Sequence, residues 1–364
     1  MKQFLLSIIF IFLSGILFPG FTGGKKELPG IAERQVEIKS IKSVKDWQKE
    51  RSMVILAMQE AMGKLPERSK KNDFDLIVTD SVSRGDHYRL TVNFLAADNE
   101  RVYAYLYLPL ITVPGQKFPA MLALHGTGPL GKKYTDGETT KPNRAYAKEL
   151  AQRGYVVIAP DYPSMGEAAN HNFETDRYES GTMKGIFNHI RCVDLLQSLA
   201  CVDTAKIGVI GHSLGGHNAI FTGAFDKRLK VVVSSCGWTL MDYYDIGEAA
   251  ITKYGHRLGP WAQDRYMPLL RTKFNLDPQK IPFDFDGVIA AIAPRYFFSN
   301  SPVGDSNFDV NGVKEGIVRI TEIYRLFKAK DHLRVIYPDA AHDFPPEARE
   351  EAYRFIDQAL RRKN

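Results

Sequence analysis

The chain has 364 residues, of which 44% are hydrophobic and 25% are charged. Such a composition provides a sizeable core and excludes a wholly disordered chain, and the length is within the range of one large α/β domain. The formal net charge of +6 is spread along the sequence, apart from one basic cluster at residues 361–363. Because the sequence contains no nucleic-acid-binding motif, we expect no nucleic-acid partner.

Residues 1–24 have the pattern of a secretory signal peptide. Lys2 supplies a positive charge, residues 4–18 are mainly apolar, and small residues follow up to Gly24. The apolar stretch of about 15 residues is short for a membrane-spanning helix, which favours cleavage over an uncleaved N-terminal anchor. We therefore expect a secreted or periplasmic protein with no stable membrane insertion after cleavage, and a single domain over residues 25–364.

The N-terminal part of this domain predicts one helix followed by an antiparallel edge. Residues 43–64 form a helix candidate, with Ser43 as its cap and Gly63 near its end. Three strand-like runs follow and are separated by turn-rich sequence. We place these strands at residues 74–79, 88–94 and 102–108.

From residue 118 onward, apolar strand candidates alternate with helix candidates. Runs such as residues 155–159 are apolar throughout, which is typical of parallel strands covered on both faces. We predict strands at residues 119–124, 154–159, 206–210, 230–235, 295–299 and 333–337, and helices at residues 143–153, 183–200, 214–225, 312–329 and 346–361. The predicted fold class is α/β, with a mainly parallel central sheet flanked by helices and an antiparallel N-terminal edge.

Residues 237–293 interrupt this alternation. They separate two predicted strands by far more than an ordinary connection and are rich in tryptophan, tyrosine and phenylalanine. Long insertions of this kind often cover a substrate site, so we predict a helical cap insertion. The alternative is a helical layer that covers an exposed edge of the sheet.

The stretch with the strongest chemical pattern is residues 206–216, which read as strand, sharp turn and helix. Ser213 lies at the turn, between Gly211 and Gly215. This is the G-x-S-x-G pattern of a nucleophilic serine, in which glycine avoids a clash two residues to either side. The alternative is a glycine-rich turn with a capping serine, so the prediction depends on partners elsewhere in the chain.

Candidate partners follow the other predicted parallel strands, whose carboxyl ends share one edge of the sheet. Asp305 follows the strand at 295–299, with Asp309 as a competing acid, and His342 follows the last strand. After the strand at 119–124, the backbone N–H of Thr127 (or Gly126) is placed to form an oxyanion hole with that of Leu214. The chain order of serine, acid and histidine is the order that this type of fold uses.

These motifs resemble the α/β-hydrolase superfamily, and in particular its dienelactone-hydrolase, prolyl-oligopeptidase-like and acetyl-xylan-esterase branch. The resemblance covers about residues 100–361 and rests on residues 125–128, 161–167, 202–208, 211–216 and 341–344, together with Asp305. It implies an α/β-hydrolase catalytic domain with Ser213 as nucleophile, His342 as general base and Asp305 as the acid that orients it. It is specific for the fold and the triad and not for the substrate.

The three cysteines, Cys192, Cys201 and Cys236, are expected to be buried free thiols. Cys192 and Cys201 flank one predicted helix and are too far apart to bridge. No C-x-x-C or H-E-x-x-H pattern is present, so we predict no metal ligands, and nothing in the sequence points to a cofactor.

Together the residues and the resemblance predict an exported serine carboxylic-ester hydrolase that acts through an acyl-enzyme. The expected substrate is a small-molecule or polysaccharide ester, and an acetyl xylan-type carbohydrate esterase is the more specific hypothesis. A prolyl-oligopeptidase-type peptidase, a lactone hydrolase and a non-catalytic α/β-hydrolase binding protein are the alternatives. The binding protein is disfavoured because no member of the triad is missing.

Overall fold

The computed structural model describes residues 41–68 and 73–360. The predicted signal peptide lies outside the described residues, so it stays a prediction. Among the described residues, no helix has the length and apolar character needed to cross a membrane.

The centre of the described structure is one sheet of nine strands in the order β1-β2-β3-β5-β4-β6-β7-β8-β9. Pairing is antiparallel from β1 through β3 to β5, and parallel from β5 through β4 to β9. The strands are β1 (Ile77–Ser83), β2 (His87–Ala97), β3 (Glu100–Pro109), β4 (Phe118–Leu124), β5 (Val156–Pro160), β6 (Val202–His212), β7 (Leu229–Ser235), β8 (Tyr296–Asn300) and β9 (Leu333–Ile336). The predicted fold class, with its antiparallel N-terminal edge, is confirmed.

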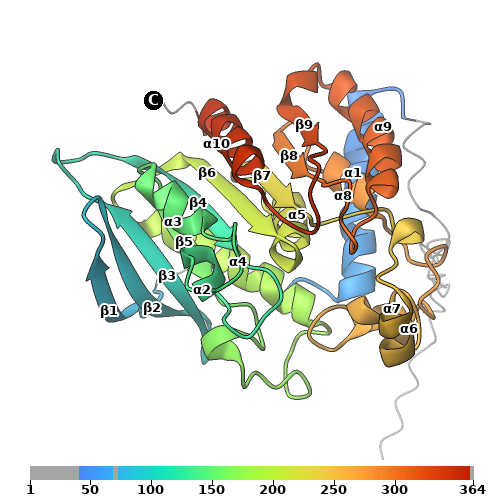
Figure 1. Cartoon of the computed structure of the whole chain (residues 1–364), viewed down its shortest axis with the longest axis horizontal. Helices are drawn as coiled ribbons and strands as arrows, with labels where there is room; N and C mark the ends of the chain where they lie inside the picture. The colour runs from blue at the N-terminus through green and yellow to red at the C-terminus, as the bar shows by residue number, and fades with distance from the viewer. Residues whose placement is uncertain (1–40, 69–72, 361–364) are drawn as a thin grey trace, which may run out of the picture. The chain divides into compact units, whose positions relative to one another are not determined.

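Helices cover the sheet on both sides (Figure 1). They are α1 (Val44–Met62), α2 (Lys133–Asp136), α3 (Tyr146–Gln152), α4 (Gly181–Ser198), α5 (Leu214–Phe225), α6 (Glu248–Tyr254), α7 (Leu269–Thr272), α8 (Phe285–Ala290), α9 (Val310–Leu326) and α10 (Pro346–Leu360). The helix boundaries predicted from the sequence agree with α1, α3, α4, α5, α9 and α10 to within a few residues.

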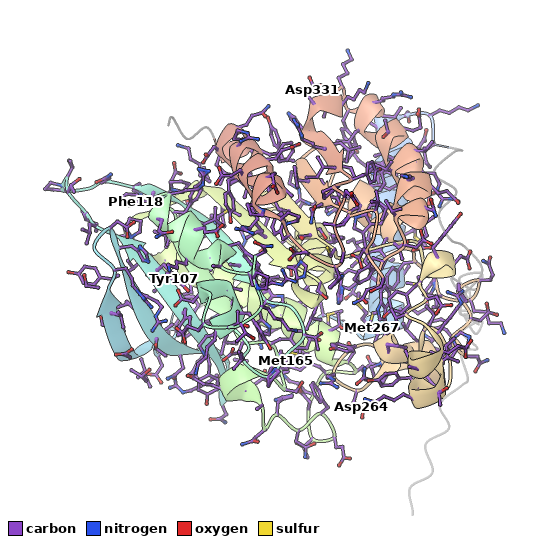
Figure 2. All side chains as sticks on the ribbon, viewed as in Figure 1. Tyr107, Phe118, Met165, Asp264, Met267 and Asp331 are labelled. Carbon is purple, nitrogen blue, oxygen red and sulfur yellow. The ribbon has the colours of Figure 1, made fainter. Side chains whose placement is uncertain are left out.

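Successive side chains of the central strands point to opposite faces of the sheet and pack into two separate hydrophobic cores. In β4, Leu122 and Leu124 contribute to the core shared with α1, α4, α5, α8 and α9, whereas Met121 and Ala123 contribute to the core shared with α3 and α10. Side chains fill the space between the sheet and the helices on each side (Figure 2). This explains why the parallel strands are apolar throughout.

The first strand, β1, begins three residues later and ends four residues later than the predicted range of 74–79. In the structure Phe74 packs edge-on against Phe94, with ring centroids 6.0 Å apart. Its carbonyl also accepts a hydrogen bond of 2.7 Å from the backbone N–H of Leu95. The strand itself, β1, is a largely exposed edge, so its polar sequence carries no burial pattern that marks it as a strand.

The segment at residues 237–293 is helical, with α6, α7 and α8 and two short 3₁₀ turns at Met241–Tyr243 and Gly259–Ala262. Several of its aromatic side chains are buried in the core on the α1 side of the sheet, among them Trp238, Tyr244 and Trp261. The segment is therefore integral to that core. Its role as a substrate cap stays a prediction.

Candidate active site

Ser213 sits in a sharp turn between β6 and α5. Its backbone has φ 57° and ψ −120°, a conformation that costs free energy for a residue with a side chain. A β-carbon at Gly211 would overlap the carbonyl of Gly215, and one at Gly215 would overlap the carbonyl of Leu124. The two glycines of the motif are thus required by the turn, and the turn places a partly exposed serine at the N-terminus of α5.

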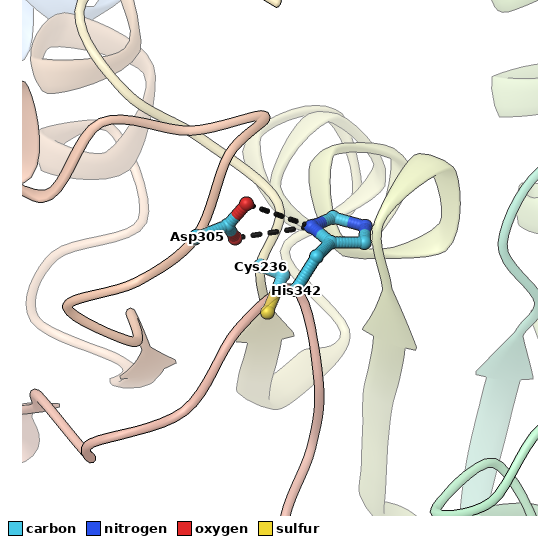
Figure 3. Close-up of side chains that lie close together, drawn as sticks. All are labelled: Cys236, Asp305 and His342. Carbon is cyan, nitrogen blue, oxygen red and sulfur yellow. Dashed lines mark hydrogen bonds and ion pairs between the residues drawn. The ribbon is translucent and has the colours of Figure 1, made fainter.

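Asp305 and His342 meet beyond the ends of β8 and β9. His342 Nδ1 lies 2.9 Å from Asp305 Oδ1 and 3.0 Å from Oδ2 (Figure 3). The Asp305 side chain is 1% exposed and the His342 side chain 22% exposed. Asp305 Oδ1 also accepts a hydrogen bond of 2.8 Å from the backbone N–H of Asn307, so the carboxylate is held in place and Nδ1 is the imidazole nitrogen that it fixes.

The competing acid has a different role. Asp309 is the N-cap of α9, where its carboxylate accepts a hydrogen bond of 2.7 Å from the backbone N–H of Asn311. Capping of this kind satisfies backbone donors that the helix leaves free. Of the two acids considered from the sequence, Asp305 is the one in contact with His342.

The structure brings Ser213 into the neighbourhood of this pair without joining them. Within residues 41–68 and 73–360, no hydrogen bond connects the Ser213 hydroxyl to His342. The ring of His212, the residue before the serine, lies 4.9 Å from the ring of His342. Hydrogen bonds of this type are often long before substrate binds, so the arrangement is compatible with a serine and base that act together.

The loop after β4 passes beside the serine. A β-carbon at Gly126 would lie 3.4 Å from Ser213 Cβ, so the loop backbone approaches the turn closely. Thr127 follows and is exposed, and its Oγ1 lies 2.9 Å from the hydroxyl of Tyr266. Leu214, the other predicted oxyanion residue, is the buried first residue of α5.

His125, at the start of this loop, is not a free base. Its Nδ1 lies 2.7 Å from the carbonyl of Gly126, and its Nε2 accepts a hydrogen bond of 2.9 Å from the backbone N–H of Tyr162. The first contact requires a proton on Nδ1 and the second requires a lone pair on Nε2, so the ring is a neutral tautomer. Burial lowers the pKa of His125, in agreement with a neutral ring.

A family model for the alpha/beta hydrolase family matches residues 121–355, which contain every predicted site residue. The chain belongs to this family. The prediction of an enzyme of the hydrolase class is thereby confirmed at the level of the family, while the roles of individual residues stay predictions.

Relatives and solved structures similar to this α/β hydrolase include several esterases. The Bacillus subtilis protein YtaP is 27% identical over 253 residues, which cover 66% of this chain and 79% of YtaP. The 4-O-methyl-glucuronoyl methylesterase of Hypocrea jecorina is 29% identical over 189 residues, 47% of this chain and 38% of that protein. A glucuronoyl esterase from Solibacter usitatus has a TM-score of 0.66 at 20% identity, with 88% of this chain and 94% of that chain covered, a likeness that establishes the fold alone.

A buried ion pair holds the loop after β4 against the loop after β5. Lys132 Nζ donates to Asp161 Oδ2 at 2.6 Å, and the Lys132 backbone N–H donates to Oδ1 at 2.7 Å. Asp161 Oδ2 also accepts a hydrogen bond of 3.0 Å from the backbone N–H of Glu167. The sequence marked residues 161–167 only through the family resemblance, and the partner Lys132 was missed because no local spacing links it to Asp161.

Sequence reasoning missed Cys236, which lies close to both Asp305 and His342. It follows β7 directly, with φ 47°, and its Sγ lies 3.1 Å from the backbone carbonyl of Asp343. Ligand atoms of Cys236, Asp305 and His342 all lie within 4.8 Å of one another (Figure 3). Burial, followed by the negative charge of Asp305, raises the pKa of the Cys236 thiol.

In the described part of the chain all three cysteines are free. Cys192 and Cys236 are buried, and Cys201 is half-buried, so the expectation of full burial is wrong for Cys201. Sequence reasoning set Cys236 aside because it belongs to no C-x-x-C pattern. The signal that was available was its position after a parallel strand, which the sequence analysis used for Asp305 and His342 only.

A network of buried polar groups supports the loop that carries His342. Asn300 Nδ2 donates to Ser235 Oγ and to the carbonyl of Asp343, both at 2.9 Å. Ser235 Oγ lies 3.0 Å from His212 Nδ1. Burial, followed by the positive charge of Arg144, lowers the pKa of His212 well below its usual range, so this histidine is a neutral packing partner of His342.

Proposed function

We propose that this α/β hydrolase is a serine carboxylic-ester hydrolase that works through an acyl-enzyme. The observation that carries the proposal is the Asp305–His342 hydrogen bond beside a serine in strained backbone geometry. A nucleophile, a base and an oriented acid at the carboxyl ends of parallel strands of one sheet form the arrangement required for acyl transfer.

In the proposed reaction, His342 Nε2 removes the proton from Ser213 as Oγ attacks the ester carbonyl. Asp305 keeps the proton on Nδ1 and stabilises the imidazolium that forms. The backbone N–H groups of Thr127 and Leu214 donate to the oxyanion. His342 then gives its proton to the departing alcohol, and water, activated by the same histidine, releases the acid and regenerates Ser213.

For the substrate we propose an ester of a carbohydrate, either a small molecule or a polysaccharide. This rests on relatives and structural neighbours that are named glucuronoyl esterases, a methylesterase and carbohydrate esterases. Export through the predicted signal peptide would bring the enzyme to such substrates outside the cytoplasm. The substrate class is independent of the proposed chemistry and is tested separately.

The reaction type is tested with a fluorophosphonate probe and a p-nitrophenyl acetate assay. We expect the purified chain to be labelled, and Ser213→Ala to lose the label and about 10⁴-fold or more of kcat/KM. Ser52→Ala is the matched control, because that exposed hydroxyl bonds only within α1 to the carbonyl of Gln48. Absence of label on the wild type, or retention of activity by Ser213→Ala, would contradict the proposal.

The substrate class is tested with a panel of acetyl, feruloyl, longer acyl and uronate methyl esters, plus a lactone and a dipeptide amide. We expect kcat/KM to be highest for one of the carbohydrate esters. Preference for the dipeptide amide would instead support the peptidase alternative, and preference for the lactone would support a lactone hydrolase.

A further inference from the structure

Three different metal-binding side chains converge beside the proposed catalytic serine. The thiol of Cys236, the carboxylate of Asp305 and the imidazole of His342 each contribute one ligand atom to a group in which no two are more than 4.8 Å apart. They approach one another from three separate loops, as Figure 3 shows. Sulfur, carboxylate oxygen and imidazole nitrogen are the three donor types that zinc takes in proteins.

The spacing of these atoms is close to what a tetrahedral ion requires. Bonds of about 2.0–2.3 Å to zinc place ligand atoms roughly 3.3–3.8 Å apart. Asp305 and His342 now lie 2.9 Å apart across a hydrogen bond, so they must separate by a few tenths of an ångström. The thiol lies within 4.8 Å of both and must move inward by up to about 1 Å, a shift that side-chain rotation can supply.

The charges also balance when an ion is bound. A thiolate, a carboxylate and a neutral imidazole around a divalent cation have zero net charge, which lowers the cost of burying the ion. The backbone carbonyl of Asp343 loses its contact with the thiol proton, yet it keeps a hydrogen bond of 2.9 Å from Asn300 Nδ2. Loss of the thiol contact therefore does not leave the carbonyl of Asp343 without a partner.

From this geometry we propose that Cys236, Asp305 and His342 form an inhibitory binding site for a thiophilic divalent cation such as Zn²⁺ or Cd²⁺. On binding, the S–H bond breaks and an S–metal bond forms, and the thiol proton leaves to solvent. His342 Nδ1 uses its lone pair to bind the metal, so its proton moves to Nε2 and Asp305 no longer accepts from it. A histidine in this state cannot take a proton from Ser213; this inhibitory effect rests on the proposed function.

Metal binding is tested first without any assay of activity. The full chain carrying Ser213→Ala is titrated with Cd²⁺, and the ultraviolet charge-transfer band of cadmium thiolate is recorded together with binding by calorimetry. We expect one Cd²⁺ per chain and a thiolate band. Cys236→Ser should abolish the band and weaken binding by roughly 100-fold or more, and Asp305→Asn should weaken it as well.

Cys201→Ser is the matched control, since Cys201 is the half-buried free cysteine outside the group. It should leave the band and the affinity unchanged. A wild-type chain with no thiolate band, a band that survives Cys236→Ser, or an affinity that Asp305→Asn does not alter would each overturn the site. These outcomes are readable even if the chain hydrolyses no ester.

Inhibition is measured second, on the chain with Ser213 intact and the best ester of the panel. Saturating Zn²⁺ should reduce kcat/KM at least about tenfold, a chelator should restore it, and Cys236→Ser should require roughly 100-fold more metal for the same loss. Full activity of a chain that shows the cadmium band would overturn the assignment of His342 as a ligand. Absence of ester hydrolysis in the metal-free chain counts against the proposed function alone.

Discussion

The turn at Ser213 and the segment at residues 237–293 are both next to the proposed site, yet they are built in opposite ways. The turn is defined by backbone geometry over five residues, where Gly211 and Gly215 admit no side chain. The segment is defined by ring packing, such as the 4.6 Å contact of Tyr244 with Trp261 and the 5.3 Å contact of Trp261 with Phe285. A local motif can specify the first, whereas only long-range packing specifies the second.

The segment contacts residues of the proposed site at a few side chains. The hydroxyl of Tyr266, from the segment, lies 2.9 Å from Thr127 Oγ1 in the proposed oxyanion loop. Phe308 stacks on His342 with ring centroids 5.9 Å apart and also contacts Trp261 at 6.3 Å. We therefore expect changes in the turn and triad to remove the reaction, and changes in the segment to adjust it.

The largest effect should come from Asp305→Asn. An asparagine at this position favours the wrong tautomer of His342, and the loss in kcat should be about 10⁴-fold with little change in stability. Asp309→Asn is the matched control, because asparagine caps a helix as well as aspartate does. Steady-state kinetics should show a much lower kcat for Asp305→Asn than for Asp309→Asn. Equal activity of the two variants would contradict the assignment of Asp305 as the acid that orients His342.

A smaller but still large effect is expected from Gly215→Ala. The new methyl group would overlap the carbonyl of Leu124, and relief of this clash should cost roughly 3 kcal/mol of unfolding free energy, together with most of the activity. Gly287→Ala in α8 is the control, since its β-carbon would lie 3.6 Å from the nearest atom, Val54 Cγ2. Urea denaturation should show that variant to be as stable as the wild type or more so.

The proposed site and the segment at residues 237–293 also differ in how much of their structure could be predicted from the sequence. The G-x-S-x-G motif identified Ser213, and strand ends identified Asp305 and His342, because each signal lies within a few residues of the side chain. The Lys132–Asp161 pair was missed because the two residues are far apart in sequence, and Cys236 was missed because its position after a parallel strand was not used. Residues 237–293 were recognised as helical and aromatic, but their burial in the core depends on contacts with distant helices that no local pattern encodes.

Asp284 lies near the end of the segment at residues 237–293 and bonds to Met241 near its start. Its carboxyl group should make the free energy of unfolding depend on pH. Its carboxyl group accepts from the backbone N–H groups of Met241 and Phe285. Burial, followed by the charge of Asp286, raises the pKa of Asp284 from the ordinary 3.8 to about 8. The folded state therefore holds a proton that the unfolded state releases, and this contribution to stability is lost as pH rises from about 4 to 8.

Asp284→Asn should remove that loss, because the amide oxygen still accepts both hydrogen bonds and carries no charge. We expect the variant to gain roughly 4 kcal/mol over the wild type between pH 5 and pH 9 in urea denaturation. Asp242→Asn, in the same segment but with a side chain 57% exposed, should show no such gain. A difference between Asp284→Asn and wild type that does not change with pH would contradict this explanation.

The smallest effect is expected where the segment contacts the proposed oxyanion loop. Tyr266→Phe removes only the hydrogen bond to Thr127 Oγ1 and keeps the ring, which packs 6.2 Å from that of Tyr162. One such bond contributes about 1 kcal/mol, so kcat/KM should fall by a few-fold. If Tyr266 holds the oxyanion loop in place, Tyr266→Phe should lower kcat. If the hydroxyl only contacted substrate, its removal would raise KM instead.

Tyr243→Phe, which removes a hydroxyl bonded to Glu315 at 2.6 Å, is the matched control and should change neither constant. Equal kinetics for the two variants would mean that the segment does not act on the oxyanion loop through this bond, and that its influence on the reaction passes instead through Phe308 and the ring of His342.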